Sequence, residues 1–75
     1  MDQKTANLIQ EYLESHVNVI IWHNNQTAGF WYWSVMVAET DFWLESFNNN
    51  DDAIKYCEKH ELLIVDIIDD KKGGN

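Results

Sequence analysis

The chain has 75 residues and a mass of 8.9 kDa, with no proline, one cysteine, four tryptophans and a formal charge of −8. A chain this short has volume for a single small core, which excludes a multidomain enzyme. Because 13 acidic residues stand against five lysines and no arginine, we do not expect the protein to bind nucleic acid directly through its own surface.

The sequence shows neither an apolar span nor a signal-peptide pattern, and it has a single cysteine, so we predict a cytoplasmic protein. The sequence has no apolar run of about 18 residues, so no membrane span is expected. Residues 1–4 lead into an amphipathic segment, whereas a signal peptide would have a charged start followed by an apolar stretch. Cys57 is alone and cannot form an intramolecular disulfide, which suits a reducing compartment. If the gene is carried by a phage, the compartment is the host cytoplasm.

The first third of the chain predicts a helix followed by a strand. Over residues 2–15, apolar side chains recur at helical spacing and form one stripe that we expect to be buried, with Asp2 or Thr5 as the cap. The stripe consists of Thr5, Leu8, Ile9, Tyr12, Leu13 and His16. Residues 17–23 are β-branched and aromatic, which predicts a strand, and residues 24–29 have the composition of a loop.

The middle of the chain carries the strongest strand signal. Residues 30–38 contain four consecutive aromatic residues and two valines without a breaker, and both faces of such a strand are apolar, so we expect it to be central in its sheet. Alternation places Trp31 and Trp33 on one face and Tyr32 on the other. After a short polar connection, residues 42–47 predict a third strand. A helix over residues 41–47 is the competing interpretation.

A helix start of unusual clarity follows at residues 48–52, where asparagine and aspartate combine capping with acidic residues in the first turn. We therefore predict a second helix over residues 51–60, with Cys57 on its buried side. Residues 62–68 are an almost continuous apolar run and predict a fourth strand. Residues 69–75 have nothing to bury and predict a flexible tail of mixed acidic and basic residues.

The predicted fold class is α+β, with the order α-β-β-β-α-β over residues 1–68. A three- to four-stranded, mostly antiparallel sheet would carry two helices on one face. The order of the first five elements resembles that of the double-stranded RNA-binding domain. That family holds RNA through a basic cluster at the start of its second helix, where this chain has Asn50, Asp51 and Asp52. The resemblance is therefore one of topology and implies that the family's activity is absent.

Acidic residues concentrate in the second half of the chain and form the first candidate site. Residues 39–70 contain ten acidic residues and two lysines. Carboxylates two apart on a strand project about 6.6 Å apart, a spacing similar to that of phosphates along a nucleic-acid strand. We therefore interpret this acidic surface as one that docks to a basic partner protein or mimics nucleic acid. The alternative is that it only keeps the protein soluble. The candidate residues are Glu39, Asp41, Glu45, Asp51, Asp52, Glu58, Asp66, Asp69 and Asp70.

Aromatic residues form the second candidate site, because seven of them fall within residues 30–47 and two helices cannot cover them all. We expect the remainder, with Trp31, Tyr32, Trp33 and Trp43 as candidates, to form a protein interface, where Trp and Tyr are enriched. The alternative is a crowded core together with a homodimer contact. Base stacking is disfavoured by the missing cationic groove.

Metal binding and catalysis find little support in the sequence. Cys57 with His60 or Glu61 is an isolated pair of potential ligands, and no second pair accompanies it, so no metal or other cofactor is predicted. No nucleophile motif or phosphate-binding loop is present. We therefore expect the protein not to be an enzyme.

The leading hypothesis is a small acidic protein-binding module that inhibits or sequesters a basic protein that handles nucleic acid. Proteins of phages and mobile elements that act against restriction or CRISPR systems look like this chain in size and charge. The alternative is a homodimeric structural or interaction domain that uses its aromatic sheet face, with the acidity serving only solubility.

Overall fold

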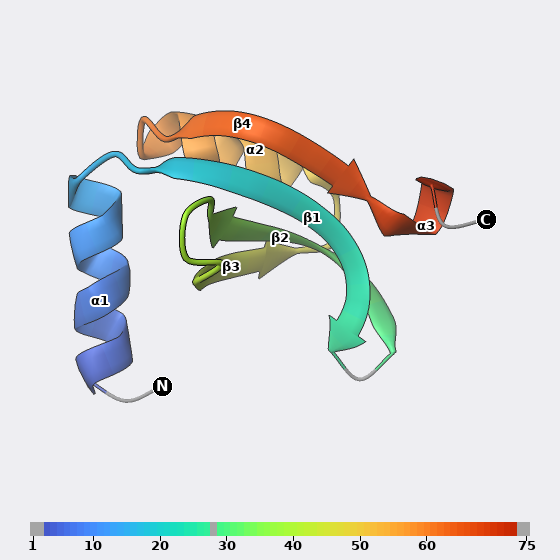
Figure 1. The fold of residues 1–75 in the computed structure, drawn as a ribbon, viewed down its shortest axis with the longest axis horizontal. Coiled ribbons are helices and arrows are strands. Elements are labelled where there is room, and N and C mark those ends of the chain that lie inside the picture. Colours follow the sequence, from blue (N-terminus) through green and yellow to red (C-terminus); the bar gives the residue numbers. More distant parts are fainter. Residues whose placement is uncertain (1–2, 28, 74–75) are drawn as a thin grey trace.

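A computed structural model describes residues 3–27 and 29–73, which form one four-stranded sheet with helices (Figure 1). The elements are α1 (Gln3–Glu14), β1 (Asn18–Thr27), β2 (Phe30–Val37), β3 (Trp43–Phe47), α2 (Asn50–Lys59), β4 (Leu63–Asp69) and α3 (Asp70–Gly73). The predicted α+β class and the order α-β-β-β-α-β are confirmed. Of residues 42–47, predicted as a strand, residues 43–47 form β3, so the competing helix is wrong.

The strand order across the sheet is β3-β2-β1-β4. The first three strands form an antiparallel meander, and the chain then crosses over through α2 to place β4 beside β1 in parallel. β2 is central, as predicted from its two apolar faces. Each of the three ladders contains one register irregularity of the kind that a β-bulge produces, which bends and twists the sheet.

The core lies between the sheet and α2. Val19 and Ile21 of β1 and Val35 of β2 are fully buried, and they meet Ala53 and Cys57 from α2. Helix α1 packs against the same core at one end of the sheet (Figure 1). The stripe predicted to be buried is only partly covered, and its last member, His16, is exposed, because α1 stands at the end of the sheet and does not lie across it.

Local contacts explain where the helices begin and end. The side chain of Asn49 caps α2 by accepting a hydrogen bond from the backbone N–H of Asp52 at 2.8 Å, which confirms the predicted helix start. At the other end, the ring Nδ1 of His16 donates to the carbonyl of His60 at 3.1 Å and ties the ends of α1 and α2 together.

Two predicted connections are structured. β1 continues through Asn24 to Thr27, so the loop predicted from residue 24 begins only after residue 27. Asn24 pairs with Tyr32 of β2, and its side-chain amide donates to the carbonyl of Trp22 and to Ser34 Oγ. Its Oδ1 also accepts from the N–H of Gln26, a local bond of the kind that asparagine makes in turns, and the ladder shifts register at this point without ending. Residues 69–73, predicted as part of the tail, form the end of β4 and the short α3. Residues 74 and 75, like the candidate cap Asp2, lie outside the described residues.

Candidate functional site

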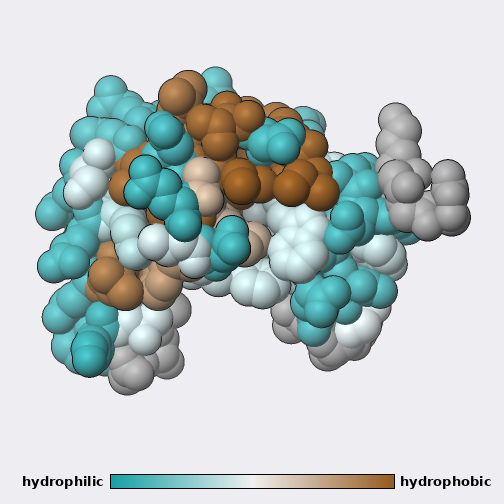
Figure 2. Space-filling model, viewed as in Figure 1, coloured by the Kyte–Doolittle hydropathy of each residue, from teal (hydrophilic) through white to brown (hydrophobic). Residues whose placement is uncertain are grey.

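The face of the sheet opposite α2 is covered by neither α1 nor α2, and it carries an apolar groove of about 360 Å³. Side chains from four segments line this groove, namely Ile20, Trp22, Met36, Asp41 and Ile68. Figure 2 looks onto this face and shows hydrophobic residues gathered over β4 and β1. A concave apolar site with a few polar groups is the usual form of a binding site.

Strand alternation places the groove residues on this side. In the β1–β2 ladder, Ile20 lies opposite Met36, and in the β1–β4 ladder Trp22 lies opposite Ile68. Their sequence neighbours Val19 and Ile21 point to the core instead. The four apolar groove residues were not among the predicted site residues. The signal that could have identified two of them is the period-2 alternation of residues 18–22, in which Ile20 and Trp22 share one face.

A hydrogen-bonded row of side chains crosses the same face beside the groove. Asn24 Nδ2 donates to Ser34 Oγ at 3.2 Å, and Ser34 Oγ lies 3.1 Å from Ser46 Oγ. Ser46 Oγ also accepts from Trp43 Nε1 at 2.9 Å. Asn24 and Ser34 are buried, at 1% and 0% exposure, so these bonds satisfy polar groups that water does not reach. The row fixes three strands and one tryptophan ring in place.

Two tryptophans form the aromatic part of the site. The rings of Trp22 and Trp43 are 6.1 Å apart in a tilted arrangement, and Trp22 Nε1 donates to Asp70 Oδ2 at 2.7 Å. Of the four predicted aromatic residues, the structure therefore brings Trp43 to the groove side. Tyr32 lies on the same face of β2 by alternation, farther along the strand.

Trp31 and Trp33 lie on the other face, around His23. Trp33 stacks on His23 at 4.0 Å with nearly parallel rings, and Trp31 is 5.2 Å from His23. His23 Nδ1 donates to Asp69 Oδ1 at 2.8 Å. This cluster is well packed, since the His23 side chain is only 12% exposed. It joins β1, β2 and β4 on the side of the core and is separate from the groove.

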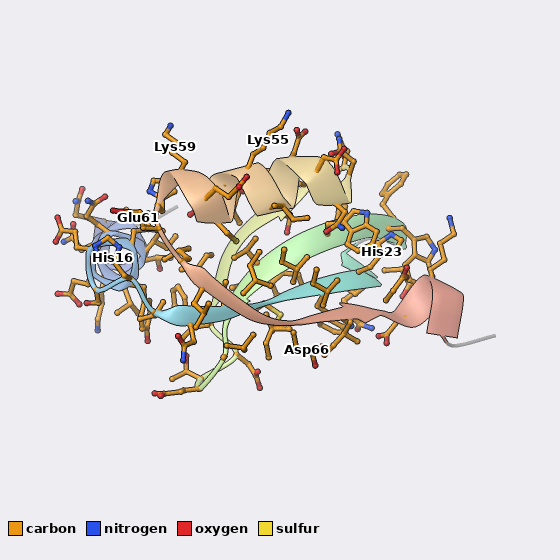
Figure 3. All side chains as sticks on the ribbon, turned by 90° about the horizontal axis from the view of Figure 1, so that it is seen from above. His16, His23, Lys55, Lys59, Glu61 and Asp66 are labelled. Atoms are coloured by element: carbon orange, nitrogen blue, oxygen red, sulfur yellow. The ribbon has the colours of Figure 1, made fainter. Side chains whose placement is uncertain are left out.

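The predicted acidic residues are divided between the two sides of the molecule. Asp41 lines the groove, and Asp66 of β4 pairs with Ile20 of β1. Asp70 accepts the hydrogen bond from the ring N–H of Trp22. Figure 3 shows Asp66 on the side of the sheet away from α2, and Lys55 and Lys59 pointing outward from α2. No lysine occurs in any of the four strands.

The remaining acidic residues lie elsewhere. Asp51, Asp52 and Glu58 are exposed on α2, and Glu45 lies on the α2 side of β3, where its charge helps to raise the pKa of Tyr56 after the larger effect of burial. Glu39 lines a separate cavity between α1 and β2. Of the nine predicted carboxylates, one, that of Asp41, thus lines the groove, and two more, those of Asp66 and Asp70, belong to residues paired with or bonded to groove residues.

Among residues 3–27 and 29–73, no three His, Cys, Asp or Glu side chains lie close enough together to hold a metal ion. Cys57 is fully buried in the core, and burial, with a smaller effect from Glu58, raises the pKa of its thiol to about 11. None of the described helices is long and apolar enough to cross a membrane.

Comparison with known proteins returned no matching family model, no similar curated protein and no similar solved structure. The groove and its carboxylates are therefore the basis for the functional proposal.

Proposed function

We propose that this protein is a protein-binding module that holds a basic, partly apolar segment of a partner on the open face of its sheet. The observation that supports this proposal is the apolar groove bordered by Asp41, Asp66 and Asp70 on a face whose strands contain no lysine. Apolar groove residues supply desolvated contact area, while the carboxylates steer a cationic partner and fix its register.

A nucleic-acid-handling protein with exposed Lys and Arg is a partner of the right chemistry, and blocking its working surface would make this protein an inhibitor of the anti-defence type. The division of carboxylates between two sides of the molecule supports docking to such a protein better than imitation of a continuous phosphate backbone. The groove also supports binding better than catalysis, because its lining contains a single titratable side chain, Asp41.

The test is an array of peptides of about nine residues that combine Lys or Arg with Leu, Ile or Phe, each paired with a copy in which Glu replaces the basic residues. We expect basic peptides to bind and their acidic copies not to bind, with affinity that falls as salt rises. If the basic and acidic copies bind equally, or neither binds, the proposal is wrong.

Two triple variants localise the binding. Asp41→Asn, Asp66→Asn and Asp70→Asn together should weaken the best basic peptide roughly tenfold and flatten its salt dependence. The matched control is Asp51→Asn, Asp52→Asn and Glu58→Gln on α2, which removes the same formal charge from the other side. Equal weakening by both triples would show that only net charge matters.

Homodimerisation is a second candidate, because large apolar side chains on β4 and β3 are exposed. Sedimentation velocity at several protein concentrations separates the two: a concentration-dependent dimer supports homodimerisation, and a monomer throughout leaves the face available to another protein.

A further inference from the structure

The outer edge of β4 combines exposed backbone with exposed apolar side chains. In the part of the chain that the structure describes, no strand pairs with this edge, because the sheet order ends at β4. Leu63 is 61% exposed, Val65 50%, Ile67 44% and Ile68 39%, whereas the other edge strand, β3, is shorter and buries Leu44. An apolar, seven-residue edge is a template for pairing with another chain.

The direction of the backbone groups follows from the pairing. The N–H of Ala38 donates to the carbonyl of Asn18, so the backbone N–H and C=O groups of Asn18 point toward β2. These groups alternate along the strand, so the backbone groups of Val19 and Ile21 point toward β4. In a parallel ladder, the β4 residues in register with these two have backbone N–H and C=O groups that point away from β1. They are Ile64 and Ile67. Their N–H and carbonyl groups therefore lie on the outer edge.

One of these edge N–H groups already donates a hydrogen bond to a carboxylate. Asp66 Oδ1 accepts a hydrogen bond from the backbone N–H of Ile67 at 2.8 Å. β3 has the same arrangement, in which Glu45 Oε1 accepts from the N–H of Ser46 at 3.1 Å. Acidic side chains at edge positions oppose pairing with a second, equally acidic strand.

Charge therefore decides which strand fits the β4 edge. Antiparallel pairing of two β4 strands would bring two Asp66 carboxylates close together in a pair of chains that each carry −8. A cationic side chain at the same place would instead be attracted, as opposite charges are across neighbouring strands. A basic partner segment fits this edge better than a second copy of the chain.

We infer that the outer edge of β4 receives an extended basic segment as a fifth strand, an inference that rests on the proposed function and specifies how the partner binds. On pairing, the N–H of Ile67 turns from Asp66 to a carbonyl of the segment, and the Asp66 carboxylate binds a Lys or Arg of the segment. Apolar side chains that alternate with the basic ones extend toward Ile68 and the groove.

Backbone methylation of the tightest basic peptide from the array tests this mode. A strand uses only alternate N–H groups toward its neighbour, so N-methylation of one alternate set should weaken binding about tenfold and methylation of the other set should leave it within about twofold. In the same complex, amide hydrogen exchange of Ile64 and Ile67 should slow. Equal effects of the two methylated sets, or unchanged exchange at both amides, overturn strand addition while leaving the proposed function standing.

A pair of charge reversals provides the matched control. Asp66→Lys should weaken the basic peptide about tenfold, whereas Glu45→Lys, which alters the same type of contact on the other edge, should change binding by less than about twofold. Equal losses overturn the assignment to β4. Failure of every basic peptide to bind overturns the proposed function as well, and a β4-dependent dimer in sedimentation would assign the edge to a second copy.

Discussion

Two adjacent isoleucines on β1 provide a direct test of which side of the sheet is open. Ile21 is fully buried against α2, whereas Ile20 is half-buried and lines the groove. The substitutions Ile21→Ala and Ile20→Ala remove the same atoms from the same strand, one residue apart. Only their surroundings differ, so each substitution is the control for the other.

The expected magnitudes follow from burial. Removing three carbons from a fully buried side chain costs about 2.4 kcal/mol in transfer free energy, and the cavity raises the loss for Ile21→Ala to about 3–4 kcal/mol. A domain of this size has a free energy of unfolding of roughly 4–11 kcal/mol, so this variant loses a large part of its stability. Ile20→Ala should lose less, about 1.5–2 kcal/mol, because its side chain is only partly buried and solvent can enter the space that the lost atoms leave.

Urea unfolding followed by tryptophan fluorescence and by far-UV circular dichroism measures both losses, with equal m-values as the check that the unfolded states are comparable. Basic-peptide affinity, measured on the folded fraction, should fall for Ile20→Ala and remain unchanged for Ile21→Ala. If Ile20→Ala destabilises the protein as much as Ile21→Ala, another chain covers the groove in solution and the face is not open.

Four further predictions concern the supports of the site and the core. Asn49→Ala removes the cap of α2 and should lower the free energy of unfolding by about 1 kcal/mol in urea titrations, with Asn48→Ala as control. Ser34→Ala leaves Asn24 without one acceptor and should cost about 1–2 kcal/mol; a loss below the error of the titration would contradict the hydrogen-bonded row. The Cys57 thiol should resist a thiol reagent at about pH 8 until urea unfolds the chain. Its raised pKa also predicts stability that is complete below about pH 9 and falls toward about pH 11, a fall that Cys57→Ala should reduce.

The sequence predicts the elements well because each has a local signature. Four aromatics and two valines specify β2, and the asparagine and aspartate run specifies the start of α2. The end of β1 could not be predicted, since Asn24 favours a turn in isolation, whereas its place in the sheet depends on pairing with Tyr32 and on the bond to Ser34, eight and ten residues later. Residues 69–73 were missed for a related reason, because Asp69 and Asp70 find their partners, His23 and Trp22, far away in the sequence.

The candidate site is less predictable than the fold. In the sequence, most acidic residues lie after residue 38 and form one group. In the fold, strand alternation and the crossover through α2 divide them between the two faces of the sheet. Asp51 belongs to α2, whereas Asp66, fifteen residues later, lies on the side of the sheet away from that helix. The apolar run of β4 resembles a buried strand, and its position at the edge depends on a parallel pairing that no local pattern encodes.

That parallel pairing also sets the order in which the sheet can assemble. Val37 can find Val19 as soon as a hairpin closes, whereas Ile64 reaches the same residue only after about 45 intervening residues have been made and folded back. The hairpin should therefore form early and β4 should dock late. A chain that ends before residue 62 would present β1 as a bare apolar edge, so nascent or truncated forms should aggregate where the full chain does not.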